Sequence, residues 1–596
     1  MDFIMCGIIG FWNIEKQAFP VIIDSLKKLE YRGYDSFGLA VLSESGSLNI
    51  EKQVGKVSET KCNEVSGKIG IGHTRWATHG KVTEKNTHPH IDCSRKIAVV
   101  HNGIIENFQE LRNELLRTHK FFSETDTEVI PHLIEDEIRE GFSLKQAVIN
   151  TGKKLKGRNA FVVLHADTEE IIAFRNGSPL IVGLKKINGF SEIFIASDIQ
   201  AFLHETKEVM YLDDDQIVII KEKPEFYDIN TNEKIEKRLI KIDIDFSPVT
   251  KGDYAHFMLK EIMDQKQTLM KAINQNDREL MHVAEEINNS RGVFFIGCGT
   301  AARVCHTAEY VFSSIADKHV NFVPASEFGN YKHFLLPETL VIAISQSGET
   351  ADVLEALKIA KEKGSKVISI VNVQESSVSK ISDYVFHINA GPEKAVASTK
   401  ATTSQIAVVI LLAYACSGML REGDRLLVDL AAKVNDMLNP RYSEHIKNIA
   451  EKIYQKENMF IIGRGVNYPM ALESAIKIME VSYIHAQGFG GGELKHGPIA
   501  LIEEGTPVIV LVSNDVSRDE IISNAIEVKS RGAKIIGIAP ENNEAFDYWI
   551  KTPDTSEISS SIVNLIPVQL LAYYLGILRG HNVDYPRSLA KSVTVK

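Results

Sequence analysis

A cysteine directly follows a methionine near the start of the chain, in the stretch Met5–Gly10. If Cys6 becomes the first residue of the mature protein, its thiol lies beside its own α-amino group. That amine has an ordinary pKa of about 7.7–8.0 and can act as the base that activates the sulfur. Residues 1–4 would block the amine, so we expect translation to start at Met5 or the segment to be removed. The alternative is a buried strand cysteine, the usual fate of a free thiol.

A second group of polar residues in the N-terminal third suits the binding of an amino acid. The segment His73–Gly80 places a guanidinium, an indole and two imidazoles close together in sequence. Arg75 can clamp a carboxylate with two hydrogen bonds, and Asp126 can hold an ammonium group. Asn102 and Gly103 follow a β-like run, where a side-chain amide and a backbone N–H can form an oxyanion hole. Each fragment has a plain alternative, because loop histidines and Asn-Gly turns are common.

A hydroxyl-rich loop lies between a predicted strand and a predicted helix in the second half of the chain. Residues Ser345–Thr350 read Ser-Gln-Ser-Gly-Glu-Thr. Backbone N–H groups and the helix dipole favour an anion at a helix N-terminus, and the hydroxyls add donors. The loop lacks the lysine of nucleotide-triphosphate sites, so a sugar monophosphate fits better. The alternative is a serine-rich N-cap that binds no ligand.

Proton-transfer groups follow further along the chain. Lys477 and Glu480 are three residues apart on a helix predicted over 468–481, so they share one face. A surface salt bridge is the default interpretation of such a pair. The glycine-rich segment Gly488–Pro498, which presents His496, favours a different one, because a flexible polar loop can close over a small ligand. Glutamate and histidine would then transfer protons.

The elements that must position these residues differ between the two halves of the chain. Residues 6–221 alternate short β-like runs with amphipathic stretches at 20–31 and 127–139, which predicts stacked sheets with helices outside. Residues 221–252 are charged and lack long apolar periods, which indicates a connector. From about residue 280, apolar strands alternate with helices, the pattern of parallel α/β sheets.

The second half contains an internal repeat. The run at 293–299 resembles the run at 459–465, and the strand at 340–345 resembles the strand at 508–513. Matching order and spacing favour two copies of one α/β unit, although any two doubly wound sheets look partly alike. The copies differ in the loop after the second of these strands. In the second copy this loop contains Asp515, whose negative charge would repel a phosphate. We therefore predict one phosphate site per chain.

Bulk composition limits the class of protein. The chain has 596 residues, 44% hydrophobic and 24% charged, which is typical of a soluble globular protein of three to four domains. A net charge of −11 argues against a general nucleic-acid binder. The six cysteines show no CxxC spacing, so neither a zinc site nor a disulfide framework is predicted. The longest apolar run, 406–416, indicates a buried helix, and no membrane span or signal peptide is expected.

Taken together, the motifs resemble the glutamine–fructose-6-phosphate aminotransferase family over essentially the whole chain. The N-terminal motifs are similar to its glutaminase domain: Cys6–Gly10, Tyr31–Ser36, His73–Gly80, His88–His90, Asn102-Gly103 and Glu124–Glu128. The C-terminal motifs are similar to its two sugar-isomerase (SIS) domains: Ser345–Thr350, Val396–Lys400, Gly492–Pro498 and the Lys591 tail. The resemblance implies an α/β multidomain protein with an N-terminal αββα sandwich of the N-terminal-nucleophile type and two doubly wound parallel-sheet SIS domains.

The resemblance also implies roles for individual residues. Cys6 would attack the side-chain amide of glutamine, and Lys591 would form a Schiff base with fructose 6-phosphate. His496, from the neighbouring subunit of a homodimer, would assist ring opening, and Glu480 would move a proton between C1 and C2. Asn102 and Gly103 would stabilise the oxyanion. The implied binding residues are Arg75, Trp76 (also gating an ammonia channel), Thr78, His79 and Asp126 for glutamine, and Thr300, Ser345, Gln346, Ser347, Thr350, Ser398 and Lys477 for the sugar phosphate.

The implied organisation and location follow from the same resemblance. It predicts an amidotransferase domain at 6–221, a connector at 222–283, SIS domains at 284–424 and 450–586 with a helical linker at 425–449, and a tail at 587–596 over the active site. The product would be glucosamine 6-phosphate, the first step of hexosamine synthesis, made in the cytoplasm without metal or organic cofactor.

One departure from the family pattern keeps other functions open. The family loop Cys-Gly-Thr-Ser reads Cys298–Ala301 here, with alanine in place of serine, so one hydroxyl near the phosphate is missing. An alternative is therefore a related amidotransferase–isomerase that acts on another keto-sugar phosphate. A third possibility is a non-catalytic sugar-phosphate sensor. Such a sensor would lack the proton-transfer groups that this chain retains.

Overall fold

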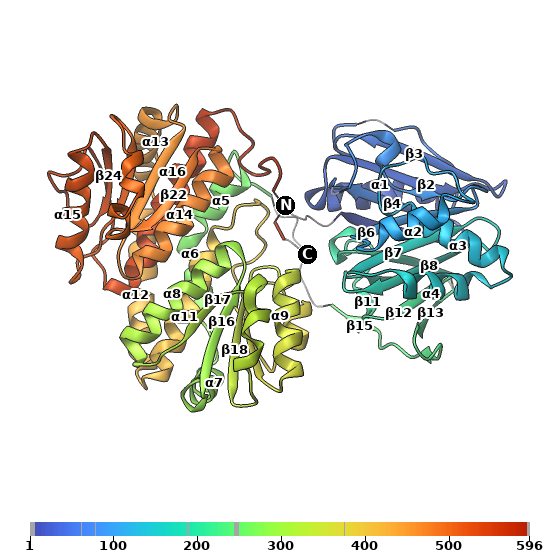
Figure 1. The fold of residues 1–596 in the computed structure, drawn as a ribbon, viewed down its shortest axis with the longest axis horizontal. Helices are drawn as coiled ribbons and strands as arrows, with labels where there is room; N and C mark the ends of the chain where they lie inside the picture. The colour runs from blue at the N-terminus through green and yellow to red at the C-terminus, as the bar shows by residue number, and fades with distance from the viewer. Residues whose placement is uncertain are drawn as a thin grey trace. The chain divides into compact units, whose positions relative to one another are not determined.

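The chain forms two compact units (Figure 1). The computed structural model describes residues 6–60, 62–77, 79–187, 190–242, 250–374, 376–589 and 591–592. The first unit holds the described residues up to 242, and the second holds those from 250 to 591.

Two antiparallel sheets build the first unit. Over the described residues, the larger sheet has the strand order β15 (Ile240–Lys241), β11 (Glu208–Tyr211), β9 (Ile181–Ile187), β10 (Phe190–Ala196), β1 (Gly7–Trp12), β4 (Ile69–Arg75), β2 (Ser36–Leu42) and β3 (Leu48–Val54). The other has the order β14 (Lys234–Ile235), β13 (Pro224–Asp228), β12 (Gln216–Ile220), β8 (Glu170–Asn176), β7 (Asn159–His165), β6 (Ile97–Gly103) and β5 (His90–Ile91).

The sheets pack face to face and helices cover their outer faces, because alternate side chains of each strand point to opposite sides. In β1, Ile8 lies in the core between the sheets, whereas Ile9 and Phe11 lie in the core beneath α1 (Ala18–Leu29). The outer face of the other sheet packs against α2 (Phe108–Leu115), α3 (Val129–Arg139) and α4 (Leu144–Lys154). This four-layer arrangement confirms the predicted αββα sandwich.

The region predicted as a connector, residues 222–283, contains strands and helices in the structure. Strands β13, β14 and β15 within it pair with strands of the two sheets. The rest forms α5 (Phe257–Met263), α6 (Gln265–Ile273) and the start of α7 (Asp277–Asn289), which pack into the core of the second unit. The sequence pattern missed these strands, of which β14 and β15 lie at sheet edges, because they are short and mostly solvent-facing. Backbone pairing holds them without an apolar period.

The second unit contains two parallel five-stranded sheets, counted over its described residues. The first has the order β17 (Asn321–Pro324), β16 (Gly292–Gly297), β18 (Thr339–Ser345), β19 (Lys366–Val371) and β20 (Tyr384–His387). The second has the order β22 (His485–Gly490), β21 (Asn458–Gly463), β23 (Pro507–Leu511), β24 (Lys534–Ala539) and β25 (Tyr548–Lys551). Both follow the order 2-1-3-4-5 in chain sequence, which confirms the predicted repeat.

Helices cover both faces of each sheet (Figure 1). One core joins the inner faces of the two sheets and includes α8 (Gly299–Ala316), α11 (Lys400–Cys416), α12 (Leu420–Met437), α13 (Pro440–Ile453), α14 (Asn467–Ser482) and α16 (Glu557–Leu578). On the opposite faces lie α9 (Ala351–Glu362) and α10 (Ser377–Ile381) on the first sheet, and α15 (Arg518–Lys529) on the second. The predicted helical linker at 425–449 falls within α12 and α13.

The two most apolar helices of the second unit lie in its interior. Helix α11 contains the run predicted as a buried helix, and almost all of its side chains are buried. Among the described residues, only α16 is long and apolar enough to cross a membrane, and 83% of its apolar window is buried. Because α16 packs against α14 within the shared core, it is a core helix of this unit.

Candidate functional site

The predicted glutamine-site residues of the first unit gather around Cys6, directly before β1. The backbone N–H of Trp76 donates to Cys6 Sγ at 3.2 Å, and Asn102 Nδ2 donates to the Cys6 carbonyl at 2.7 Å. Strand β1 pairs with β4, which ends at Arg75, and β6 ends at Asn102 and Gly103. The two sheets therefore deliver these side chains to one place from strands far apart in sequence.

The conformation of the Asn102–Gly103 strand end explains its glycine. Gly103 has φ +139°, a region that favours glycine, and a Cβ there would lie 2.2 Å from the Arg158 carbonyl oxygen. The Asn102 side chain is buried, and its amide nitrogen faces Cys6. An amide N–H donor beside the cysteine residue is an element that an oxyanion hole requires.

Arg75 and Asp126 lie on the same side of the site. The Arg75 guanidinium donates to the carbonyl oxygens of His79 and Gly80 at 2.6 and 3.1 Å. Burial lowers its pKa, and the nearby Cys6, Asp35 and Asp126 oppose that shift. Asp126 is buried and accepts from the Ile105 N–H at 2.9 Å. Both charges of an amino acid therefore have a candidate partner.

The environment of the thiol decides how reactive it is. With Cys6 linked through a peptide bond, burial raises the pKa of the thiol to about 11. The neighbouring imidazoles give little help, because burial also lowers the pKa of His73 to about 3 and keeps it neutral. A thiol in this setting needs a dedicated base. Residues 1–5 and Thr78, which carry further predictions, lie outside the described residues.

The predicted sugar-phosphate loop of the second unit turns around Gly348, between β18 and α9. Gly348 has φ +66°, and a Cβ there would lie 2.1 Å from Ser376 Oγ. The Ser345 hydroxyl lies 3.4 Å from the Thr350 hydroxyl and accepts from the Gly348 N–H at 3.0 Å. The acidic member of the loop points elsewhere, since Glu349 Oε1 accepts from the Ser377 N–H at 2.8 Å. The hydroxyls thus converge at the N-terminus of α9.

A buried chain of charges lies on α14. Lys477 Nζ donates to Glu480 Oε2 at 2.5 Å and lies 3.5 Å from Glu473 Oε1. The same Glu473 oxygen accepts from Thr300 Oγ1 at 3.0 Å, which links α14 to the first turn of α8. Burial disfavours the charged lysine, but Glu480 and Glu473 raise its pKa above the ordinary value. Burial also raises the pKa of Glu473, to about 7.

The C-terminal tail brings Lys591 to a buried carboxylate that the sequence pattern did not reveal. Lys591 Nζ donates to Glu393 Oε2, which also accepts from Ser398 Oγ at 3.1 Å. Burial pushes the pKa of Glu393 up, but Lys591 and the N–H groups of Thr399 and Ala401 hold it below the ordinary value. Glu393 and Lys591 are 198 residues apart, so spacing carries no signal for the pair.

The sequence analysis also did not identify three acidic residues that lie near the candidate sites: Glu473, Glu261 and Asp35. Glu261 accepts from the Ala395 N–H at 3.3 Å, and burial beside Glu393 raises its pKa to about 8. Asp35 accepts from the Ala77 N–H at 3.0 Å near Cys6. Of these three acidic residues, only Asp35 lies in a motif noted in the sequence, the segment Tyr31–Ser36.

His496 lies apart from the Lys477 cluster of its own chain. It follows a single 3-10 turn (Glu493–Lys495) and is exposed. Over the part of the chain that the structure describes, no side-chain hydrogen bond or ion pair joins His496 to Lys477 or Glu480. The contribution of His496 to a neighbouring subunit stays a prediction.

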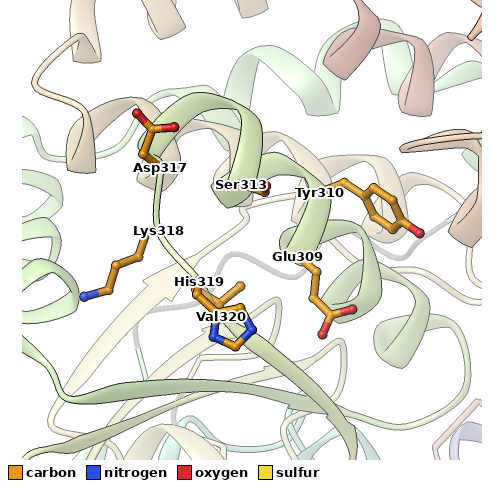
Figure 2. A pocket seen from close by; sticks show the side chains of 7 residues that line it. All are labelled: Glu309, Tyr310, Ser313, Asp317, Lys318, His319 and Val320. Atoms are coloured by element: carbon orange, nitrogen blue, oxygen red, sulfur yellow. The ribbon is translucent and has the colours of Figure 1, made fainter.

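A pocket of about 510 Å³ lies elsewhere, at the C-terminal end of α8 (Figure 2). Figure 2 shows the carboxylates of Glu309 and Asp317 around it, together with His319. Two carboxylates would repel a phosphate, and none of the predicted sugar-phosphate residues lines this pocket. It is therefore distinct from the site at Ser345 and Lys591.

Comparisons with known proteins agree with the division into amidotransferase and isomerase parts. Residues 73–204 match the model of a glutamine amidotransferase domain, and residues 286–415 and 452–579 each match the SIS domain. The C-terminal domain of a glucosamine-fructose-6-phosphate aminotransferase from Francisella tularensis is 32% identical with a TM-score of 0.52, and the match covers 57% of this chain and 100% of that one.

Similar proteins extend over both units. The glutamine–fructose-6-phosphate aminotransferase (isomerizing) of Pyrococcus horikoshii is 44% identical over 612 residues, and that of Thermococcus kodakarensis is 42% identical over 608 residues. Each match covers 99% of this chain and 100% of the relative. The chain therefore belongs to the glutamine–fructose-6-phosphate aminotransferase (isomerizing) family.

Proposed function

We propose that the protein converts fructose 6-phosphate and glutamine into glucosamine 6-phosphate and glutamate. The observation that carries this proposal is the tail lysine held at a buried carboxylate: Lys591 Nζ pairs with Glu393, beside the Ser398 hydroxyl. An amine fixed in a polar pocket suits imine formation with a ketose.

In the first unit, the proposed reaction is the hydrolysis of glutamine. The Cys6 thiolate attacks the side-chain amide carbon, and the Asn102 amide and the Gly103 N–H stabilise the oxyanion. Arg75 holds the α-carboxylate of glutamine and Asp126 its ammonium group, with Trp76, Thr78 and His79 completing the binding residues. Collapse of the intermediate breaks the C–N bond and releases ammonia. Water then cleaves the thioester to glutamate and restores the thiol.

The proposed base for Cys6 is its own α-amino group, after removal of the preceding residues. The support for this proposal is that burial raises the thiol pKa to about 11 while Cys6 is in peptide linkage. A free amine with a pKa of about 7.7–8.0 would take the thiol proton at neutral pH.

In the second unit, the proposed reaction is amination and isomerisation of the sugar. Lys591 forms an imine at C2 of the open ketose, releasing water, and ammonia displaces the lysine. Glu480 removes a proton from C1 and returns it to C2, while the O1 hydroxyl loses its proton and the imine nitrogen gains one. The product has an aldehyde at C1 and an amine at C2. Lys477 Nζ donates to Glu480 Oε2 and so orients the carboxylate that transfers the proton.

The proposed phosphate ligands are the hydroxyls of the Ser345–Thr350 loop. Ser345, Gln346, Ser347 and Thr350 would donate to the phosphate together with Thr300, and Ser398 would contact the sugar. The convergence of hydroxyls at the N-terminus of α9 supports this assignment. Ala301 offers no hydroxyl in the first turn of α8, so Thr300 alone would serve there.

His496, acting from the partner subunit of a homodimer, is proposed to assist ring opening of the sugar. Its exposed loop supports that role. The proposed location is the cytoplasm, where thiols stay reduced.

The test of the proposed function is to incubate pure protein with glutamine and fructose 6-phosphate and to identify the amino sugar. We expect glucosamine 6-phosphate, and Cys6→Ala is expected to abolish its glutamine-dependent formation while synthesis from added ammonia remains. Cys62→Ser, another half-buried cysteine of the first unit, is the matched control. Amination of another keto-sugar phosphate but not of fructose 6-phosphate would overturn the proposal.

A further inference from the structure

Four metal-ligating side chains meet in the first unit, outside the set assigned to glutamine. They are Cys93 in the turn between β5 and β6, His119 after α2, and His132 and Glu135 one turn apart on α3. The four ligand atoms all lie within 4.8 Å of one another. The two imidazoles are fully buried, the Glu135 side chain is 5% exposed, and Cys93 is exposed.

The distances fit one small cation. Cys93 Sγ lies 3.5 Å from His119 Nδ1 and 3.8 Å from His132 Nδ1. Glu135 Oε2 lies 3.2 Å from His119 Nδ1 and 3.7 Å from His132 Nδ1. Zn–S and Zn–N bonds of ordinary length at tetrahedral angles place sulfur and nitrogen about 3.6 Å apart, and two light ligand atoms about 3.4 Å apart. Four of the six ligand–ligand distances are therefore within a few tenths of an ångström of those in a zinc site, and the other two are at most 4.8 Å.

The outer nitrogen of His119 faces a carboxylate within hydrogen-bonding distance, whereas that of His132 is buried and has no hydrogen-bond partner among the described residues. His119 Nε2 lies 2.8 Å from Asp136 Oδ1, and His132 Nε2 lies 3.9 Å from Glu128 Oε1. A proton on Nε2 that is shared with a carboxylate leaves the Nδ1 lone pair for a metal, which is the usual arrangement around zinc-bound histidines.

We propose that Cys93 Sγ, His119 Nδ1, His132 Nδ1 and Glu135 Oε2 bind one zinc ion in a closed tetrahedral site. A set of one thiolate, two imidazoles and one carboxylate suits zinc better than magnesium or calcium, which prefer oxygen ligands. The thiol loses its proton to solvent when the metal binds. The exposure of Cys93 gives the ion an entry path.

The site would act as a brace for the first unit. It links the β5–β6 turn to the end of α2 and to α3. These three segments are separate in sequence and meet only in the folded unit. Strand β6 ends at Asn102 and Gly103, and α3 begins just after Asp126. On the proposed function, which this last step assumes, the metal holds the oxyanion residues and the ammonium-binding carboxylate in register. Protein ligands fill all four coordination positions of the metal, so it has no open position for substrate and takes no part in the chemistry.

Cysteine spacing did not predict this site, because its ligands come from three separate segments. The only sequence signal is His132 and Glu135 at a three-residue interval on one helix, which alone is commonly a helix-surface pair.

The experiment is metal analysis of the full-length protein, purified without chelator, by inductively coupled plasma mass spectrometry. We expect one zinc per chain, lost in Cys93→Ser and in His119→Gln and retained in the control Cys62→Ser. Chelator-treated wild type titrated with zinc chloride should rebind one equivalent and regain its thermal midpoint. Cobalt in place of zinc should give a thiolate-to-metal charge-transfer band that Cys93→Ser lacks.

A milder variant covers the case in which a ligand variant fails to fold. Asp136→Asn keeps all four ligands and should weaken zinc affinity by about 10- to 100-fold, because it removes the carboxylate that orients His119. Chelator-treated wild type that binds no zinc, or zinc content unchanged by Cys93→Ser, would overturn the site. A protein that is zinc-free as purified and binds no added zinc, yet still makes glucosamine 6-phosphate, would overturn the metal site and leave the proposed function standing.

Discussion

The two parallel-sheet halves of the second unit share one strand order but treat negative charge in opposite ways. In the first half, the hydroxyls of Ser345 and Thr350 converge after β18, and the one acidic residue of that loop turns toward Ser377. In the second half, the Asp515 carboxylate accepts from the hydroxyls of Ser513 and Ser517 and from the Ser517 N–H. A carboxylate of the protein thus takes the donors that a phosphate would use in the first half.

The difference teaches how a duplicated fold can divide one reaction. The first half keeps an anion site at a helix N-terminus, where the fold itself supplies N–H donors. The second half fills its own site and contributes α14 instead, with the charged cluster that reaches the first turn of α8. On the proposed function, binding and proton transfer reside on different copies and can therefore change independently.

The largest expected effect concerns the charged helix of the second half. We expect Glu480→Gln to lower kcat by about 10²- to 10⁴-fold, because the substitution removes a general base. KM for fructose 6-phosphate should change little, because no contact to the phosphate is removed. Glu451→Gln, on the exposed face of α13, is the control. Steady-state kinetics measure both, and a change confined to KM would contradict the assignment of proton transfer to α14.

The next effect concerns the junction of the two halves and its pH dependence. The pKa of Glu473 is raised from 4.5 to about 7, so the folded state binds the extra proton between those values. Stability from this group is present below pH 4.5 and falls as the pH rises to 7, by about 3 kcal/mol across the window. We expect Glu473→Gln, which keeps an acceptor for Thr300, to flatten this decline.

Thermal midpoints of wild type and Glu473→Gln from pH 5 to 8 provide the measurement. The difference between the two proteins should grow in favour of the variant as the pH rises. A constant difference across the range would show that Glu473 does not titrate in the folded protein near neutral pH.

The smallest effect compares matching serines of the two loops. Ser345→Ala should raise KM for fructose 6-phosphate by about 10- to 100-fold, because it removes a hydrogen bond to a charged ligand, while kcat changes less. Ser513→Ala, at the corresponding position of the second copy, should leave KM within about twofold because Asp515 occupies that loop. Equal effects of the two substitutions would erase the proposed difference between the halves.

Local patterns predicted most of the fold. The helix predicted over 468–481 is α14, and the strands predicted at 340–345 and 508–513 are β18 and β23. These segments have strong periodicity because each buries one face or both. The short strands β13–β15 were missed because they are held mainly by backbone hydrogen bonds, which leave little mark on composition.

The candidate sites were predictable only where a motif is local. The Ser345–Thr350 loop and the Lys477–Glu480 pair each lie within one element and its cap. Glu393 could not be paired with Lys591 from spacing, and Glu473 became visible only through its bond to Thr300. The assignment of Cys6, His496 and the Arg75 group rested on resemblance to the family, and these roles stay predictions.

The amino-acid sequence by itself determined the two kinds of sheet, the internal repeat and the short motifs, because periodicity and turn chemistry act over neighbouring residues. Tertiary structure alone decided which charges meet: Lys591 with Glu393, Glu473 with Thr300, and Cys93 with two histidines and a glutamate. The physical reason is that electrostatic and coordination energies depend on distance in space and on burial. Chain separation fixes neither of these until the core has packed.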